Sequence, residues 1–210
     1  MLRDIRTNYQ KFELTEQSVN QDPFQQLILW MNDAISSQQP DPNAMILSTI
    51  DSLGNPDSRV VLLKELTSEG LIFFTSYDSK KGQQIAANQH VSVVFLWVGL
   101  ERQVRIKGKA EKIDEKDSEL YFKSRPIESQ LGAWASPQSQ IIESRQVIND
   151  NYKNYQQLFE NKKITKPPHW GGYIILPQYF EFWQGRSSRL HDRIEFCLTD
   201  QSWVINRLAP

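Results

Sequence analysis

The sequence lacks most of the residues and motifs that mark hydrolytic or metal-dependent enzymes. It contains one cysteine, Cys197, and three histidines that lie far apart in the chain. These residues allow neither an internal disulfide nor a multi-cysteine zinc site, so no metal is expected. The patterns G-x-G-x-x-G, G-x-x-x-x-G-K-S/T, H-E-x-x-H and G-x-S-x-G are also absent. Dinucleotide loops, hydrolytic triads and metal catalysis therefore have no support.

Long apolar runs and an excess of charge are missing too. The longest strongly apolar run, residues 91–100, is about half the length of a membrane-spanning helix, and residues 1–10 lack the apolar stretch of a signal peptide. Lys and Arg number 24 against 25 Asp and Glu, which removes the bulk electrostatic argument for binding nucleic acid or acidic membranes. We therefore expect a cytoplasmic globular protein that binds neither.

The spacing of apolar residues predicts an α+β protein built on an antiparallel barrel. Asp22 and Pro23 are typical of a helix start, and apolar residues at helical spacing follow as far as Ser37. Short β-rich runs in the first and last thirds enclose a helical middle, which favours one domain, residues 21–210, after an N-terminal arm, residues 1–20. The predicted strands are 44–50, 59–66, 71–76, 91–98, 102–113, 172–176, 179–184, 193–198 and 203–208, and the later helices are 81–88, 114–125 and 140–161.

The most informative segment runs from residue 180 to 193, F-E-F-W-Q-G-R-S-S-R-L-H-D-R. If its end is extended, Arg189, His191 and Arg193 lie on one face. Such a row of cations is tolerated where solvent screens it or where an anion lies against it. The ordinary interpretation is a solvated strand face, with Trp183 in the core.

Other cationic groups could also bind phosphate. Residues 79–81, S-K-K, open a predicted helix whose N-terminal amides favour an anion. Each of these groups also has an interpretation without a ligand. The two lysines can belong to a surface turn, Arg125 can be a cation at a helix C-terminus, and Arg59 and Lys64 can be the charged ends of a buried strand. Arg59 and Lys64 have opposite parity, so a regular strand cannot present both on one face. Tyr121, Arg125 and Ser129 are further groups that suit a phosphate. Because the sequence also has 11% aromatic residues and no evident nucleophile, these phosphate-binding groups together indicate a protein that binds a phosphorylated aromatic cofactor.

Residues 180–184 and 189–193 together resemble the signature of the pyridoxamine (pyridoxine) 5′-phosphate oxidase family, flavoproteins of vitamin B6 metabolism. The resemblance runs from about Arg6 to the last residue. Further segments match in order: 59–64, 101–104, 124–126, 132–134, 170–172 and 207–210.

The resemblance implies an FMN-binding split β-barrel and a homodimer with FMN at the subunit interface. The implied reaction oxidises pyridoxine or pyridoxamine 5′-phosphate with O₂ to pyridoxal 5′-phosphate and releases hydrogen peroxide, with ammonia from the amine. The implied FMN residues are Arg59, Val60, Val61, Leu62, Leu63, Lys64, Phe74, Thr75, Lys80, Lys81, Gln103, Gln138, Ser139, Trp183 and Arg193. The implied substrate residues are Arg6, Tyr9, Lys64, Tyr121, Arg125, Ser129, Arg189, Leu190 and His191.

Within that set, the resemblance gives Arg189 and His191 the catalytic roles, and Arg6 with Tyr9 the role of a lid. Two positions depart from the pattern. Lys80 stands where the family commonly has arginine, and the lid segment 6–9 matches only at its ends. A lysine supplies a point charge instead of a bidentate fork, so weaker binding of the FMN phosphate is expected. The rival hypotheses are a flavin or F420-dependent reductase that consumes NAD(P)H, and a pyridoxal-phosphate carrier without turnover.

Overall fold

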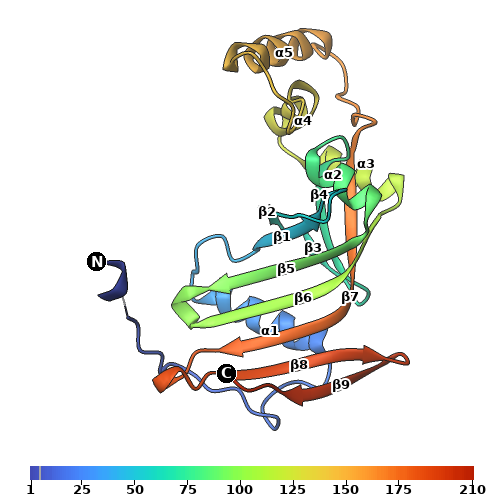
Figure 1. Ribbon diagram of the computed structural model, residues 1–210. Helices are drawn as coiled ribbons and strands as arrows, with labels where there is room; N and C mark the ends of the chain where they lie inside the picture. The colour runs from blue at the N-terminus through green and yellow to red at the C-terminus, as the bar shows by residue number, and fades with distance from the viewer. Residues whose placement is uncertain (5) are drawn as a thin grey trace.

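The computed structural model describes residues 1–4 and 6–210, which build one nine-stranded antiparallel sheet with flanking helices (Figure 1). The hydrogen-bonded path runs β2-β1-β5-β6-β7-β4-β3, and β8 pairs with β7 and β9. The predicted α+β fold, built on an antiparallel barrel with flanking helices, is confirmed. The strands are β1 Ala44–Ile50, β2 Pro56–Leu62, β3 Glu65–Leu66, β4 Leu71–Ser76, β5 His90–Trp97, β6 Arg102–Lys112, β7 Trp170–Gln184, β8 Asp192–Thr199 and β9 Ser202–Arg207.

The helices flank this sheet, and α1 covers its inner face. Asp22 caps α1 as predicted, because its side chain accepts a hydrogen bond from the Phe24 N–H. Aromatic contacts join the helix to β7: Phe24 lies 5.3 Å from Phe180 and Trp30 lies 5.3 Å from Phe182, measured between ring centroids. The helices are α1 Pro23–Ser36, α2 Lys80–Ala87, α3 Glu115–Ser124, α4 Ile127–Ala135 and α5 Arg145–Leu158.

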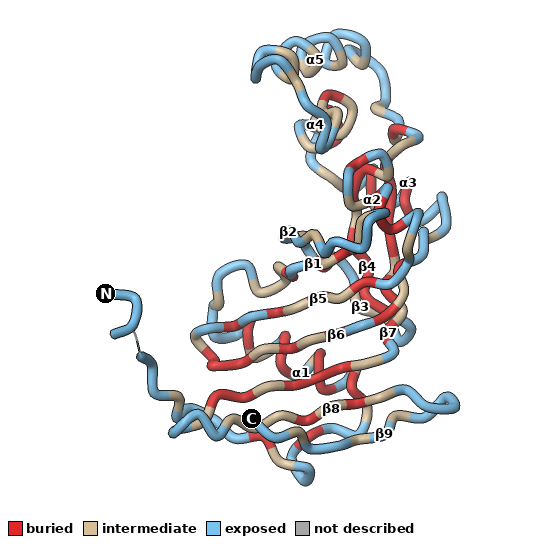
Figure 2. Tube along the Cα trace, viewed as in Figure 1, coloured by how far each residue is buried: buried red, intermediate tan, exposed pale blue. Residues whose placement is uncertain are grey.

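The two ends of the molecule differ in how far their residues are buried. Buried residues follow α1 and the strands, whereas α4 and α5 project beyond the end of the sheet (Figure 2). Every residue of α5 is at least partly exposed. In the N-terminal arm, Leu14 and Val19 are 3% and 5% exposed and belong to the hydrophobic core. Part of the arm is therefore a fixed component of the fold.

Strand β7 differs from the sequence-based expectation. Residues 172–176 and 179–184 were expected as two strands, but they form one strand through Pro177. The partner strand β6 shifts its register between Lys107 and Gly108, opposite this proline. A side chain at Gly108 would collide with the Leu176 carbonyl, so glycine allows the close approach at the irregularity. A proline that cannot donate a ladder hydrogen bond is accommodated there.

Among the residues that the structure describes, no helix is long and apolar enough to cross a membrane. Within the same ranges, no group of three or more His, Cys, Asp or Glu side chains is placed to hold a metal ion.

Candidate active site

A cavity of about 740 Å³ lies beside β2 and β4, at the N-terminus of α2. Its size suits a small-molecule cofactor or substrate. We call it the main cavity. Four residues that were not predicted line it: Asp57, Ser58, Pro126 and Trp170. The other lining residues were all predicted to bind FMN or substrate, and they are Arg59, Val60, Val61, Leu62, Lys64, Phe74, Thr75, Lys80, Lys81, Tyr121, Arg125, Ser129, Gln138 and Ser139. Leu63, which was predicted with them, lies in the core at 6% exposure.

A break between β2 and β3 brings Arg59 and Lys64 to the same cavity despite their opposite parity. The predicted continuous strand, residues 59–66, ends at Leu62 and resumes at Glu65. In between, the Lys64 N–H donates to the carbonyl of Ile72 on β4 (2.9 Å). Like a β-bulge, this interruption changes the alternation of side chains along the strand, so that Lys64 lines the same cavity as Arg59.

The start of α2 places Lys81 against polar side chains. Ser79 caps the helix by accepting from the Gly82 N–H (3.3 Å). The Lys81 Nζ donates to Thr75 Oγ1 (3.1 Å) and to Gln138 Oε1 (2.9 Å). Burial, and secondarily the charge of Arg59, lower the pKa of Lys81 to about 8. A half-buried ammonium beside a helix N-terminus is a suitable partner for a phosphate.

Asp57 is the carboxylate in the wall of this cavity, and the sequence analysis did not single it out. Its Oδ2 lies 2.9 Å from Arg59 Nη2 and 3.1 Å from Lys80 Nζ. The hydrogen bond from Lys80 lowers the pKa of Asp57. Two cations predicted to contact FMN therefore share one internal counter-ion. No motif signals Asp57 in the sequence, because an acidic residue at a strand start is common on surfaces.

Arg125 carries an unusual guanidinium. Among the buried side-chain nitrogen and oxygen atoms of the described residues, its Nη1 alone has no hydrogen-bond partner. The guanidinium lies over Trp170, 4.6 Å from the ring centroid, and burial lowers the pKa of Arg125. Phe74 stacks with Tyr121 (3.8 Å, 13°) and with Trp170 (5.5 Å, 12°), and the rings of Tyr121 and Trp170 lie 6.3 Å apart. An unpaired cation nitrogen beside a rigid aromatic stack fits an anionic aromatic ligand.

All but one of the remaining predicted substrate residues line a second cavity of about 560 Å³, which we call the arm cavity; Leu190 does not. Its lining includes Arg6, Tyr9, Arg189 and His191, together with Thr7, Asn8, Arg186 and Ser188. The rings of Tyr9 and His191 lie 5.8 Å apart, and Trp183 lies 4.6 Å from His191 and 5.8 Å from Tyr9. Leu190, predicted as a substrate contact, is 68% exposed.

The predicted row of Arg189, His191 and Arg193 on one extended face is wrong. Ser187–Arg189 forms a short 3-10 turn in which Ser188 and Arg189 have φ angles of 56° and 62°, and β8 begins only at Asp192. Residues in this left-handed region reverse the chain, so the alternation of an extended strand does not apply. Arg193 pairs instead with Glu181 (3.0 Å), and its predicted contact with FMN stays a prediction.

The two groups of residues lie far apart within one chain. Gln103 pairs with Trp183 across β6 and β7 and faces the same outer side of the sheet as Leu62 on β2. Because β1, β5 and β6 stand between β2 and β7, four strand spacings separate them, about 19 Å. One chain therefore does not bring all the predicted site residues together.

The outer side of the sheet between these groups is apolar and exposed, which the sequence analysis missed. Its exposed side chains gather on β1, β2 and β5 and just beyond β5. A patch of this kind is typical of protein–protein or membrane contacts and of ligand-binding grooves. The signal was present in the sequence as strands with apolar residues on both faces. The residues are Ile46 (39% exposed), Val60 (63%), Leu62 (42%), Leu96 (56%) and Val98 (69%).

Comparisons with known proteins agree with this site. A family model described as pyridoxamine 5′-phosphate oxidase matches residues 31–159. A second, described as pyridoxine 5′-phosphate oxidase C-terminal dimerisation region, matches residues 170–210. A protein of Synechocystis sp. named pyridoxine/pyridoxamine 5′-phosphate oxidase is 51% identical over 209 residues, covering 100% of this chain and 98% of that protein. One of Acidovorax sp. with the same name is 47% identical and covers 100% and 96%.

Solved structures show the same architecture. PhzG from Burkholderia lata 383, in complex with tetrahydrophenazine-1-carboxylic acid, has a TM-score of 0.88 and 26% identity, covering 94% of this chain and 98% of that one. An FMN-binding protein from Nostoc punctiforme, related to pyridoxamine 5′-phosphate oxidase, has a TM-score of 0.72 at 16% identity, covering 92% and 99%, and shows the fold alone. From the family models and the full-length relatives, this chain belongs to the pyridoxamine 5′-phosphate oxidase family.

Proposed function

We propose that this protein is an FMN-dependent pyridoxine/pyridoxamine 5′-phosphate oxidase, a homodimeric enzyme of vitamin B6 metabolism. It oxidises pyridoxine or pyridoxamine 5′-phosphate with O₂ to pyridoxal 5′-phosphate, releasing hydrogen peroxide and, from the amine, ammonia. Family membership supports the activity and the dimer. The observation that carries the proposal is the main cavity, where cations with few counter-ions surround a stacked aromatic wall.

The main cavity fits FMN by its donor set. Lys81, Lys80 and Arg59 offer three cations to a phosphate at the start of α2, where backbone amides add to the attraction. Gln138 already holds Lys81 and Thr75 through its Oε1 (2.9 and 3.0 Å), which keeps the cluster preorganised. We assign FMN binding to this cluster and to the β2 residues, as the resemblance implies.

A second phosphate, that of the substrate, has its own donors. Arg125 has the unpaired Nη1, and Tyr121 and Ser129 add hydroxyl groups in the same cavity. Lys64 lies beyond the end of β2 and adds a further ammonium. We infer that these four residues hold the substrate phosphate and so fix the position of the ring.

The other side of the site comes from a second copy of the chain. The exposed apolar patch on the outer sheet face begins on β2 with Val60 and Leu62, which also line the main cavity, and reaches Leu96 on β5; Trp183 lies two strands further on. In a dimer with two-fold symmetry the same patch contacts itself, so β2 of one protomer can meet β7 and the arm cavity of its partner. This arrangement supports an active site that is complete only in the homodimer.

FMN, when bound, supplies the two-electron acceptor and the subsequent reaction with O₂. The chain itself supplies orientation and charge. Arg189 adds a cation to the arm cavity and would orient and polarise the pyridine ring. His191 accepts the Arg186 N–H at Nδ1 (3.1 Å), so its neutral ring carries the proton on Nε2. That N–H is a hydrogen-bond donor for the substrate.

The division of the chain into an arm, residues 1–20, and a single domain, residues 21–210, remains our proposal. Residues 9–20 contribute contacts to the core and to the arm cavity, which supports treating the arm as part of the enzyme. A cytoplasmic location is likewise proposed, on the ground that a single cysteine suits a reducing compartment.

The deciding experiment is a visible spectrum of the purified protein, followed by addition of pyridoxine 5′-phosphate under air. We expect flavin absorption bands, and then equal amounts of hydrogen peroxide and pyridoxal 5′-phosphate. Consumption of NAD(P)H without a B6 substrate would favour a reductase instead. Tight binding of pyridoxal 5′-phosphate with no peroxide would favour a carrier, and failure to bind FMN on reconstitution would refute the proposal.

A further inference from the structure

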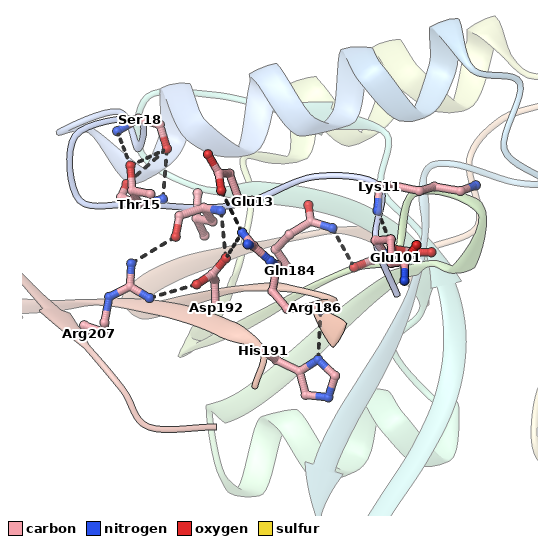
Figure 3. A network of polar contacts seen from close by, with 12 residues as sticks. Lys11, Glu13, Thr15, Ser18, Glu101, Gln184, Arg186, His191, Asp192 and Arg207 are labelled. Carbon is pink, nitrogen blue, oxygen red and sulfur yellow. Dashed lines mark hydrogen bonds and ion pairs between the residues drawn. The ribbon is translucent and has the colours of Figure 1, made fainter. Parts of the chain in front are cut away.

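Asp192, the first residue of β8, lies where three segments of the chain meet (Figure 3). Its Oδ2 accepts from the backbone N–H of Leu14 (3.1 Å) and from Nη1 of Arg186 (3.1 Å), and its Oδ1 accepts from Nη1 of Arg207 (2.9 Å). The partners belong to the N-terminal arm, to the loop after β7 and to β9. The carboxylate is mostly shielded, with 15% of the side chain exposed. One side chain thus cross-links segments that are distant in sequence.

The loop between β7 and β8 needs such anchors. Ser188 and Arg189 both have positive φ angles, 56° and 62°, and non-glycine residues in this region persist only where the surroundings hold them. On the entry side, the buried Gln184 donates from Nε2 to the carbonyls of Leu100 (3.2 Å) and Glu101 (3.1 Å). On the exit side the anchor is Asp192. The loop that carries Arg189 is therefore fixed at both ends by polar contacts.

His191 depends on the same anchor. It directly precedes Asp192, and the two side chains point in different directions: the imidazole lines the arm cavity and the carboxylate enters the polar network (Figure 3). Arg186 joins the two, because its backbone N–H donates to His191 Nδ1 (3.1 Å) while its guanidinium binds Asp192. A change at the carboxylate is transmitted to the imidazole through the adjacent backbone and through Arg186.

The N-terminal arm completes the support. Arg207 binds Glu16 through two hydrogen bonds (2.6 and 2.9 Å) and the Leu14 carbonyl (3.0 Å). Further along the arm, a side chain at Gly185 would lie 2.7 Å from the Tyr9 ring, so the loop packs directly against the arm. Tyr9 and residues 14–16 thus pack against the loop and β9, and the lid role that the resemblance implies for Arg6 with Tyr9 stays a prediction.

We propose that Asp192 is a positioning residue for the oxidase reaction: its carboxylate ties the N-terminal arm and β9 to the loop that presents Arg189 and His191. It acts through these two residues and lines neither cavity itself. The proposal rests on the proposed function for its kinetic consequence, but the tethering of the arm does not depend on it.

The test compares Asp192→Asn with Asp200→Asn, both as FMN-reconstituted full-length protein. Asparagine keeps the shape of the side chain and removes the charge that holds two arginines. Asp200 lies in the exposed turn between β8 and β9, so the control removes one charge from the same hairpin. For Asp192→Asn we expect kcat/KM per bound FMN to fall about ten- to a hundredfold, with the FMN Kd within about twofold of wild type. Amides of residues 10–16 and 186–191 should exchange hydrogen faster. Asp200→Asn should change none of these.

A second variant guards against misfolding of the first. Arg207→Lys keeps the charge but loses the fork that binds Asp192 and Glu16 together, and we expect faster amide exchange in residues 14–16 with a smaller kinetic loss. Unchanged exchange in both variants would refute the tether, whatever the enzyme's substrate. Faster exchange with unchanged kcat/KM would refute the positioning role. An inactive wild-type protein with the expected exchange pattern would contradict the proposed function and leave the tether standing.

Discussion

Two regions of this molecule are rich in arginine and lysine, and they differ in their counter-ions. In the main cavity, five cations face a single lining carboxylate, Asp57, and one buried guanidinium nitrogen has no partner. Around the arm and β7–β9, three arginines each have an acidic partner within about 3 Å, whereas Arg189 lines the arm cavity. The cavity cations are Arg59, Lys64, Lys80, Lys81 and Arg125, and the paired ones are Arg186 with Glu13 and Asp192, Arg193 with Glu181, and Arg207 with Glu16 and Asp192.

The difference separates binding from support. Excess positive charge in a partly buried cavity is costly without an anion, so it indicates a ligand site. Matched charges fix backbone segments relative to one another and leave little charge for a ligand. Both regions contain the same residue types, so only the folded arrangement distinguishes them.

The largest effect should follow from disrupting the dimer, because the main cavity of one protomer is then separated from the arm cavity of the other. Leu96→Asp places a carboxylate on the exposed apolar face of the sheet, at a position that lines neither cavity. An unpaired charge buried in an interface costs several kcal/mol, so we expect monomers by sedimentation and at least about a hundredfold loss of oxidase activity. Leu29→Asp, on the outer side of α1 where leucine is 50% exposed, is the control. A dimeric, active Leu96→Asp variant would show that this face is not the interface.

The next effect tests the division of roles. Arg189→Ala removes one of the cations that line the arm cavity, and we expect kcat/KM to fall about a hundredfold while FMN remains bound. Steady-state kinetics normalised to flavin content measure the first quantity, and fluorescence titration with FMN measures the second.

Lys81→Met is the matched variant in the main cavity. Loss of a charge-assisted hydrogen bond should raise the FMN Kd about tenfold or more and leave turnover of FMN-saturated enzyme nearly unchanged. If both variants lost FMN equally, the assignment of separate roles would be wrong.

A smaller effect concerns pH. Because the pKa of Lys81 is lowered to about 8, the ammonium is present below pH 8 and is lost as the pH rises above it. We expect FMN binding to weaken by less than about twofold from pH 7 to 8 and by up to about tenfold between pH 8 and 9. Lys81→Arg, whose side chain keeps its charge, should abolish this dependence. Titration of FMN fluorescence at each pH gives the measurement.

The smallest effect comes from Asp57→Asn. Asp57 holds Arg59 and Lys80 by ion pairs and also repels a phosphate, so its neutralisation should tighten FMN binding about two- to fivefold at low salt. The gain should shrink as salt is added. Weaker binding would mean that Asp57 serves mainly to preorganise the cations, and the contrast between the two regions would then be less sharp.

Much of the fold could be predicted, because local signals were strong. Asp22 and Pro23 predicted the start of α1, and β1 and β4 have the predicted bounds. Two features could not be derived. The helix α4 follows Pro126, which was expected only to restart the chain, and the register shift opposite Pro177 depends on how β6 and β7 approach each other.

The site was predicted less completely than the fold. Arg59, Lys81 and Arg125 line one cavity as their motifs suggested, although strand parity argued against grouping Arg59 with Lys64. The prediction of an extended row through Arg189 was wrong because Ser188 and Arg189 adopt left-handed backbone conformations. Serine and arginine have no preference for this conformation, so nothing in the sequence indicated it. Asp57 gave no signal, and Asp192 stood in the matching segment 189–193 without an assigned role, because both act through contacts with residues distant in sequence.

The packing of α1 has a consequence for how the chain folds during synthesis. This helix is complete at Ser36, but Phe24 and Trp30 contact rings of β7, near the other end of the sequence. At about 5–20 residues per second, a ribosome needs on the order of ten seconds to reach Phe182. During that interval the apolar side of α1 lacks its aromatic partners on β7, and the slow non-local pairing of β6 with β7 is still to come. Folding of this enzyme therefore finishes only after nearly all of the chain has been made.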